Sequence, residues 1–547
     1  MNRTYIALTL GPIYKTFANV RKTRELWAAS YMFSYLMRET IKNLKRKGIK
    51  DNDIIIPFVN KAAEDYKGVG IFPDRLIFKS KQGDYDKLSL AFQDAVLSLA
   101  SYFKNSTNAE SFLKEYLRMI AIEKELPAGA NIIEEMFTHL DSLELMNLPL
   151  SQEILKQNVL ADFFTNVNKP NHNRFFTENN YDKENSLAMK DINGNIRFES
   201  LMEIASSHFK SEKPEDYKDL VKHLWNNNQG DVDDKETDFI TELKKAAGDK
   251  FKPHHKYIAI IKADGDKIGS AIKELNGEIV KLQKFSEALF NWAVNCDKAV
   301  RNYGAIPIYI GGDDLLMFAP ISYGNQNIFD LIDAVDKSFA EAMKDYKGVS
   351  LSYGISITYY KFPLFEAVTK VDDLLLQAKS LSDKRNAVAI RVLKHSGSVL
   401  ETCFEKGNDP NTFQIIKDVL HAIDENLETK EKSFLNSVGY FLRDNEQTLR
   451  LVYSDKKRLE NFFKNNFDDY VTNGELLENE GKFPKRESKA EYLNQVYCLL
   501  NKIYPLKITK DPILESKEYE KQCVAALNEI YSIIRICRFI KGLEDEK

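Results

Sequence analysis

The segment that most constrains this chain is Gly311-Gly312-Asp313-Asp314, which lies between the short apolar runs Ile306–Ile310 and Leu315–Phe318. Two apolar runs joined by a turn of this length predict a β-hairpin. The glycines allow a tight turn and let the backbone approach a ligand closely. Turns rich in glycine and aspartate also occur in ordinary hairpins, so the chemistry of this turn depends on the elements around it.

The elements around this turn predict one β-α-β-β-α-β unit within residues 251–400. A strand at Lys256–Lys262 runs into Ala263-Asp264-Gly265-Asp266, and an amphipathic helix at Leu282–Tyr303 follows it. After the hairpin we expect helices at 328–346 and 364–381 and strands at 349–360 and 387–393. This order is the split β-α-β of ferredoxin-like folds, which is also the topology of the palm domains of polymerases and nucleotide cyclases.

This unit predicts a metal-dependent site for phosphoryl transfer. The strand that ends at Asp264 neighbours the hairpin that carries Asp313 and Asp314, so we expect these three carboxylates to converge. Phosphoryl transfer uses Mg²⁺ or Mn²⁺, which prefer oxygen ligands, and a pair of such ions lies roughly 4 Å apart. We therefore predict the three carboxylates as catalytic ligands of two ions. The Gly265 carbonyl is a further expected ligand, and Asp266 is a less certain one.

Further residues around the turn are expected to bind a nucleotide. Gly265, Gly311 and Gly312 leave room for the backbone to lie against a ligand. Lys379, near the end of the expected helix 364–381, is a candidate for holding a phosphate charge. A solvated lysine on a helix surface fits the same pattern.

Composition divides the rest of the chain into three further domains. Residues 1–87 read as strand, helix, strand, strand, a partial copy of the ferredoxin-like unit without the acidic turn. Residues 88–250 read as a mainly helical domain with an Asn-rich loop, and residues 401–547 as a helical C-terminal bundle after a linker at 404–412. The predicted fold class is α+β, with two ferredoxin-like palm domains, a helical insert domain and a helical C-terminal bundle.

Composition also narrows the classes of function. The formal net charge is −4 and the pI is about 6.2, which argues against a strongly basic, free-standing nucleic-acid binder. Five cysteines without a C-x-x-C pair predict neither a zinc site nor a disulfide framework. The sequence shows no signal peptide and no apolar run long enough to span a bilayer, so we expect a cytoplasmic protein without a membrane partner.

The chain resembles a known family, the large polymerase-like signalling subunits of type III-B (Cmr) CRISPR effector complexes. The stretches that carry the resemblance are Gly11-Pro12, residues 21–31 (RKTRELWAASY), Phe72-Pro73-Asp74-Arg75-Leu76, residues 263–269 with the Gly311–Asp314 turn, and Ala378-Lys379 followed by Arg385-Asn386-Ala387. The resemblance implies a first, degenerate palm on the acceptor side and a second, catalytic palm whose acidic residues are Asp264, Asp313 and Asp314. It also implies ATP as substrate, a nucleotide messenger as product, and guide CRISPR RNA, target RNA and other Cmr subunits as partners.

Three features depart from the family pattern. The sequence starts directly at the first palm and contains no His-Asp dipeptide, so we expect no HD nuclease domain. The cysteine cluster that holds zinc in many members is missing. Where the family usually has Pro-Asn-Arg, this chain has Pro73-Asp74-Arg75.

The third departure bears on the acceptor of the transferred nucleotide. The resemblance places position 74 near the nucleotide sites between the palms, where a carboxylate repels a second triphosphate and favours a cationic acceptor. Some members without the HD domain are thought to join AMP to S-adenosylmethionine, whose sulfonium and amino charges Asp74 would complement. Pairing of Asp74 with Arg75 or a lysine explains the substitution equally well. Cyclic oligoadenylate and an AMP conjugate of S-adenosylmethionine therefore both stay open as products.

Two other classes of function share part of this pattern. A stand-alone diguanylate cyclase has the same palm, but its signature continues with Glu-Phe after Gly-Gly-Asp, whereas Asp314-Leu315 follows here. A catalytically silent, structural large subunit would be expected to have lost an acidic ligand, and all three candidates are present. Both alternatives fit the sequence less well than an active nucleotidyltransferase.

Overall fold

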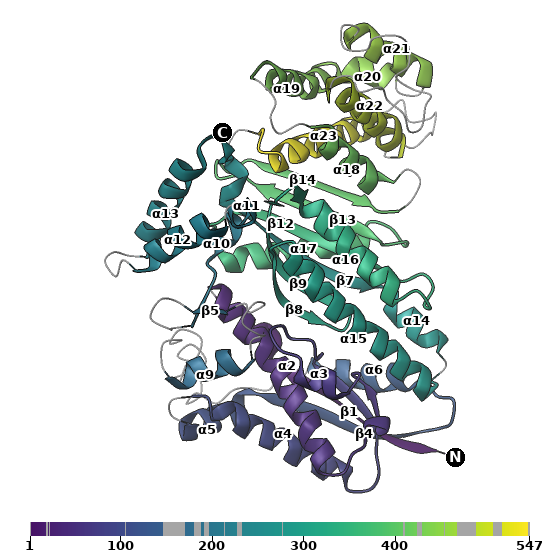
Figure 1. Ribbon diagram of the computed structural model, residues 1–547. Helices are drawn as coiled ribbons and strands as arrows, with labels where there is room; N and C mark the ends of the chain where they lie inside the picture. The colour runs from purple at the N-terminus through teal and green to yellow at the C-terminus, as the bar shows by residue number, and fades with distance from the viewer. Residues whose placement is uncertain are drawn as a thin grey trace.

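The computed structural model describes residues 2–17, 20, 22–103, 106–145, 170–179, 188–190, 196–212, 214–226, 232–275, 277–407, 411–423, 429–452, 455–467, 488–506 and 517–544. Two sheets dominate this part of the chain (Figure 1). The first sheet and its helices form one end of the molecule, and the C-terminal helices lie at the opposite end, beyond the second sheet.

The first sheet has four antiparallel strands in the order β2-β3-β1-β4. These strands are β1 (Arg3–Gly11), β2 (Ile54–Ile56), β3 (Arg75–Lys79) and β4 (Arg118–Leu126). The helices of this region are α1 (Ile13–Phe17), α2 (Thr23–Arg46), α3 (Lys61–Asp65), α4 (Asp84–Ala100), α5 (Ser106–Tyr116) and α6 (Ile132–Glu144). In β1, Ile6 and Leu8 join the core that contains α2, while Tyr5 and Ala7 join the core that contains α6. Burial on both faces explains why β1 is a continuous apolar run rather than an alternating one.

The first sheet extends further along the chain than the sequence indicated. β4 pairs with β1 from Arg3↔Leu126 to Gly11↔Arg118, although it lies in residues 88–250, which we expected to be mainly helical. The expected boundary at residue 87 falls inside α4, and the sheet has the full strand order of a ferredoxin-like unit rather than a partial one. β4 is an edge strand with mostly half-exposed residues. Its partner among the described strands, β1, lies more than a hundred residues earlier, so local pattern carried little signal.

The second sheet has six strands in the order β14-β13-β12-β7-β9-β8. They are β7 (Tyr257–Asp266), β8 (Ile306–Gly311), β9 (Asp314–Pro320), β12 (Ser350–Tyr359), β13 (Ala387–Leu393) and β14 (Val399–Glu405). Their helices are α14 (Ile268–Glu274), α15 (Ile279–Asn302), α16 (Ile328–Ala342) and α17 (Leu364–Ser380). The strands and helices expected in residues 251–400 are confirmed. β14 was not expected, and it occupies the start of the stretch that we read as a linker.

The two flanking layers of the second sheet are fixed by neighbouring residues of β12. Tyr353 donates a hydrogen bond from its hydroxyl to Asp336 of α16, at 2.9 Å. The next residue, Gly354, faces α17 so closely that a Cβ there would lie 2.5 Å from the Leu375 amide nitrogen and 2.5 Å from the Val371 carbonyl oxygen. Because successive strand residues point to opposite faces, α16 and α17 cover opposite faces of the sheet. The absent side chain at Gly354 sets the depth at which α17 packs.

The remaining described elements are mostly helical. Between the sheets lie α9 (Pro170–Asn179), β5 (Ala188–Lys190), β6 (Ile196–Phe198), α10 (Leu201–Ala205), α11 (His208–Glu212), α12 (Pro214–Asn226) and α13 (Val232–Ala247). After the second sheet come α18 (Thr412–Ala422), α19 (Thr429–Asp444), α20 (Glu446–Val452), α21 (Lys456–Phe467), α22 (Ser488–Leu506) and α23 (Lys517–Ile540). The Asn-rich stretch expected as a loop contains α9, and its other residues lie outside the described part. Within the described ranges, no helix has both the length and the apolar character that a membrane span requires.

Replacement of Gly354 by alanine tests the packing of α17. We expect Gly354→Ala to lower the free energy of unfolding by roughly 2–4 kcal/mol. The new Cβ would overlap the backbone of α17, which cannot move aside by a change of rotamer as a side chain can. Gly269→Ala is the matched control, since a Cβ there meets nothing within 4 Å, and it should change stability by less than about 1 kcal/mol. Urea denaturation of both variants measures the difference; equal effects would show that the close approach is not structural.

Candidate active site

The Gly-Gly-Asp-Asp segment is the turn of a hairpin, as predicted. β8 and β9 pair up to Gly311↔Asp314, and Gly312 has a φ of 66°, in the left-handed region that glycine adopts without strain. β9 also pairs with β7, as far as Ala263↔Leu315. The tip of the hairpin therefore lies beside the residues that end β7.

Asp313 lies directly against the end of β7. A Cβ on Gly265 would be 2.5 Å from Oδ2 of Asp313, so glycine is the residue that leaves space for this carboxylate. Burial, and to a smaller extent the neighbouring charge of Asp314, raises the pKa of Asp313 to about 7. Burial also raises the pKa of Asp314 to about 6, which Lys262 opposes and Asp74 supports. The hairpin tip thus concentrates negative charge with little compensation.

Asp264 has a different neighbour. The ammonium of Lys379, in the last turn of α17, forms an ion pair with the Asp264 carboxylate and donates a hydrogen bond to the Gly265 carbonyl at 3.1 Å. Burial lowers the pKa of Lys379 to about 8, with smaller contributions from Arg385 and Lys262.

The expected convergence of all three carboxylates is not formed. Among the residues that the structure describes, no three His, Cys, Asp or Glu side chains lie close enough together to hold a metal ion. Asp313 and Asp314 are neighbours, whereas the carboxylate of Asp264 forms an ion pair with the ammonium of Lys379. The donor set nevertheless suits a hard divalent cation, since carboxylate and carbonyl oxygens surround this point. Burial is the main cause of the raised pKa values of Asp313 and Asp314, and a bound cation would offset the cost of keeping these carboxylates charged.

Asp266 is not placed as a ligand. This buried carboxylate accepts hydrogen bonds from Ser350 Oγ at 2.8 Å, from Ser352 Oγ at 2.8 and 3.0 Å, and from the Asn386 amide at 2.9 Å. These bonds tie the end of β7 to β12 and to the loop before β13. Asp266 therefore shapes the site without facing it.

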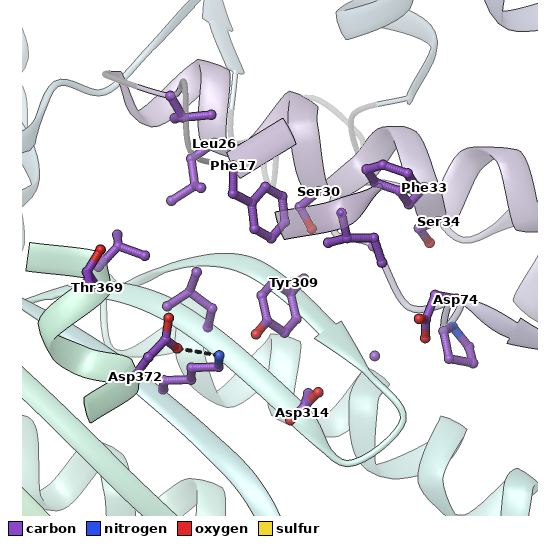
Figure 2. Close-up of a pocket in the computed structure, with 18 of the residues that line it drawn as sticks. Phe17, Leu26, Ser30, Phe33, Ser34, Asp74, Tyr309, Asp314, Thr369 and Asp372 are labelled. Carbon is purple, nitrogen blue, oxygen red and sulfur yellow. Dashed lines mark hydrogen bonds and ion pairs between the residues drawn. The ribbon is translucent and has the colours of Figure 1, made fainter. Parts of the chain in front are cut away.

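The first sheet contributes one side of the site. The Ile310 amide of β8 donates to the Gly70 carbonyl at 3.0 Å, and Gly70 forms a parallel bridge with Tyr309. This pairing brings the loop before β3 alongside the hairpin. Asp74 and Asp314 line the same two cavities, of about 330 and 230 Å³, and Figure 2 shows them on opposite walls of the larger one.

Arg75 forms its ion pairs with residues other than Asp74. The Arg75 guanidinium forms ion pairs with Asp141 at 2.6 Å and Glu144 at 3.1 Å, both in α6, and lies 4.6 Å from the centroid of the Phe137 ring. Burial raises the pKa of Asp74, and the charge of Arg75 only partly opposes this. Of the explanations that the sequence left open for Asp74, pairing with Arg75 is therefore not what the structure has.

Two cavities of different character meet at the hairpin. The 330 Å³ cavity has aromatic walls that include Phe17, Phe33, Tyr309 and Phe365, and at its floor Lys262 is paired with Asp372 (Figure 2). On the other side of Asp313 lies a cavity of about 890 Å³ with a mixed, strongly charged lining. Its basic residues are Lys267, Lys273, Lys379 and Arg385, and its acidic residues are Glu134, Asp141, Asp313 and Asp383.

Several of these residues were not found from the sequence. Lys267 and Arg385 both have φ of 59°, and Asn386 has φ of 50°, a region that non-glycine residues rarely adopt and that often marks functional sites. Available signals were weak: Lys267 directly follows the Asp-Gly-Asp segment, and Arg385 belongs to one of the stretches that carry the family resemblance. Tyr309 and Lys262 read only as ordinary strand residues.

Comparison with known proteins agrees with this geometry. Residues 257–389 match the family model described as "Cas10/Cmr2, second palm domain", and residues 5–106 match "CRISPR-associated protein Cmr2, N-terminal". The CRISPR system Cmr subunit Cmr2 of Pyrococcus furiosus is 29% identical over 195 residues, which cover 31% of this chain and 22% of the relative. The chain thus matches only about a fifth of the length of that relative.

Solved structures show a similar fold. A chain of the type III-B Cmr-β complex in its apo state has a TM-score of 0.56 at 13% identity, covering 100% of this chain and 82% of that chain. A chain of Cmr-β bound to cognate target RNA also has a TM-score of 0.56, at 12% identity, covering 92% and 83%.

A hairpin with an acidic tip on a ferredoxin-like sheet is the arrangement that palm-domain proteins have. The two matching models follow the two sheets in order, and the match to the second palm model spans the acidic hairpin. Two parts of the chain, residues 5–106 and residues 257–389, are thus similar to the N-terminal region and the second palm domain of the Cas10/Cmr2 family.

The crowding of charge at the hairpin tip predicts a pH-dependent stability. Because folding raises the pKa of Asp313 from 3.8 to about 7, the folded state binds this proton more tightly than the unfolded chain does. The metal-free protein should therefore lose stability as pH rises from about 4 to about 7. We expect Asp313→Asn to raise the free energy of unfolding in EDTA by roughly 1–3 kcal/mol more at pH 8 than at pH 5.

Urea denaturation at the two pH values measures this difference. Asp249→Asn, at an exposed residue outside the three cavities, removes the same charge and should give no such pH-dependent gain. A destabilising Asp313→Asn at pH 8 would contradict the account.

Proposed function

We propose that the chain is the nucleotidyltransferase subunit of a type III-B CRISPR antiviral complex, activated by target RNA that pairs with the guide CRISPR RNA. In this proposal it acts together with other Cmr subunits and makes a nucleotide second messenger from ATP. The first sheet domain serves as the non-catalytic palm on the acceptor side, and the second as the catalytic palm. The helical segments between and after the sheets serve as insert and C-terminal domains.

One observation carries this proposal: the half-buried pair Asp313 and Asp314 lies where an aromatic cavity meets a charged cavity that contains Lys267, Lys379 and Arg385. A transferase needs a place for each of two substrates and a charged centre between them. The family match supports the same assignment, since the second palm model covers residues 257–389.

The carboxylates would hold the metal ions. Asp264, Asp313, Asp314 and the Gly265 carbonyl would bind two Mg²⁺ or Mn²⁺, which offset negative charge on the phosphates and lower the pKa of a bound hydroxyl. For Asp264 and Gly265 this requires Lys379 to move away.

The chain's own cations would orient ATP. Lys267, Lys379 and Arg385 line the 890 Å³ cavity beside Asp313, where they would bind the triphosphate, and Gly311 and Gly312 let the nucleotide approach the turn. The acceptor hydroxyl gives up its proton to water, its oxygen forms a bond to the α-phosphorus, and the bond from that phosphorus to the bridging oxygen breaks. Pyrophosphate then leaves toward Lys267, Lys379 and Arg385. These side chains then balance the charge of the leaving group.

The acceptor would occupy the 330 Å³ cavity on the Asp314 side. Its aromatic walls suit a nucleobase, and the carboxylates of Asp74 and Asp314 suit a positive charge beside it. A second ATP as acceptor leads to cyclic oligoadenylate, and S-adenosylmethionine leads to its AMP conjugate. The engagement of Arg75 with α6 leaves the charge of Asp74 directed at the cavity, which favours the cationic acceptor.

Removal of both hairpin carboxylates tests the catalytic assignment. We expect Asp313→Ala/Asp314→Ala to lower product formation by a factor on the order of 10² or more, because both the metal ligands and the charged centre are lost. The measurement is turnover of labelled ATP by the assembled complex with guide and target RNA. Asp249→Ala is the control and should retain full activity. Undiminished turnover by the double variant would refute the assignment.

Replacement of Asp74 tests the acceptor. The wild-type complex is incubated with labelled ATP, with and without S-adenosylmethionine, and the products are identified by mass. We expect a product that contains the sulfonium compound, and we expect Asp74→Asn to raise the KM for S-adenosylmethionine by about tenfold while changing that for ATP little. Asp86→Asn, at an exposed residue of α4, controls for net charge. If the wild type makes only cyclic adenylates, the role given to Asp74 is wrong and the transferase proposal stands.

A further inference from the structure

Lys379 occupies a position that a metal ion would require. Its ammonium contacts the Asp264 carboxylate and the Gly265 carbonyl, which are two of the oxygens proposed above as metal ligands. A carboxylate and a carbonyl that hold an ammonium between them form the same kind of oxygen-lined seat that a divalent cation uses. An ammonium and a divalent ion cannot share that seat, because they repel each other and need the same oxygen lone pairs.

Lys379 also has somewhere else to go. Its side chain extends from the last turn of α17 and is 17% exposed. The same side chain lines the 890 Å³ cavity together with Lys267, Ser382 and Arg385. A lysine has a flexible four-carbon stem, so rotation about that stem can carry the ammonium from Asp264 into this cavity without moving the helix. The cavity already carries the carboxylates of Glu134, Asp141 and Asp383, and a bound triphosphate would add a larger negative charge that attracts the ammonium.

The surroundings of Lys379 allow its ammonium two separate positions, one at Asp264 and one in the cavity. α17 is held at a fixed depth by its backbone contact with Gly354, and the end of β7 is held by the hydrogen bonds of Asp266 to Ser350, Ser352 and Asn386. Both the lysine's anchor and the oxygens it contacts are therefore rigid. Rotation of the Lys379 side chain is therefore the rearrangement that separates the two groups without moving the backbone.

We infer that Lys379 is a gate for the metal site: it closes the seat at Asp264 and Gly265 in the nucleotide-free protein and opens it when a triphosphate draws its ammonium into the 890 Å³ cavity. Lys379 is then a positioning residue in both states. Nucleotide and metal binding are coupled, and by thermodynamic linkage each strengthens the other by the same factor. This device keeps the protein from assembling a charged metal centre before a nucleotide is present.

The inference rests on the proposed function for the nature of the nucleotide, but its test needs no turnover. Mn²⁺ is titrated into the full-length, nucleotide-free protein, and bound ion is counted from the loss of the free Mn²⁺ signal in electron paramagnetic resonance. Lys379→Gln should bind Mn²⁺ on the order of tenfold more tightly than the wild type, since the competing ammonium is gone. Lys379→Arg, which keeps the positive charge, should bind as weakly as the wild type.

Two controls separate the gate from a general effect of charge. Lys384→Gln removes one positive charge from an exposed residue that follows α17, and it should leave Mn²⁺ affinity unchanged. In an Asp264→Asn background, the change Lys379→Gln should no longer tighten binding, because the shared oxygen ligand is lost. Lys379→Met keeps the length of the stem and replaces the glutamine variant if thermal melting shows that the latter is unfolded.

The Mn²⁺ titration tests the gate, and the transferase assay tests the proposed function. Unchanged or weaker Mn²⁺ binding by folded Lys379→Gln or Lys379→Met overturns the inference, as does equal tightening by Lys384→Gln. A complex that makes no nucleotide product would refute the proposed function but would leave the Mn²⁺ titration readable. A gate that fails in the titration would leave the transferase assay unaffected.

Discussion

A single backbone contact, the hydrogen bond from the Ile310 amide to the Gly70 carbonyl at 3.0 Å, joins the two sheets at the point where the site forms. It uses the free edge of β8, the outermost strand of the second sheet. Gly70 itself lies so close to α2 that a Cβ would be 3.1 Å from the Cβ of Ser34, which ties the loop to its own domain as well. Together with the hydrogen bonds from Gln283 to the Ile54 carbonyl at 2.7 Å and from Tyr66 to Asp297 at 2.6 Å, this attachment places Asp74 at the cavities.

The second constraint is charge. The hairpin places Asp313 and Asp314 side by side in a crowded position, where both pKa values rise because of burial. Positive charge lies nearby but is largely committed elsewhere: Lys262 is paired with Asp372, and Lys379 with Asp264. The site therefore combines an excess of negative charge at its centre with a cavity on one side that contains Lys267, Lys379 and Arg385. Such an arrangement suits a cation at the centre and a phosphate chain beside it.

Much of the second sheet could be predicted from sequence because its elements are strongly patterned and connected locally. Local sequence pattern is enough to predict three of these elements: the strand KYIAIIK, the amphipathic helix with Trp292, and the hairpin around Gly311 and Gly312. The first sheet was harder. β4 is a half-exposed edge strand that closes onto β1 over more than a hundred residues, and no local pattern encodes that pairing. β14 escaped for a related reason, since it too is an edge strand and lies next to polar sequence.

The sequence by itself determined that the Gly-Gly-Asp-Asp segment is a hairpin turn beside the Asp-Gly-Asp strand end, because turn chemistry and strand period are local properties. It also supplied the α+β class and the family resemblance. Only the tertiary structure decided which acidic side chains face the site. Asp266, two residues from Asp264, accepts hydrogen bonds from Ser350, Ser352 and Asn386. Asp74, from the domain of the first sheet, lines the same cavity as Asp314. Lys379 lies on Asp264 for the same reason: which charges meet depends on how α17 and the two sheets pack, and packing is set by contacts between residues far apart in the chain.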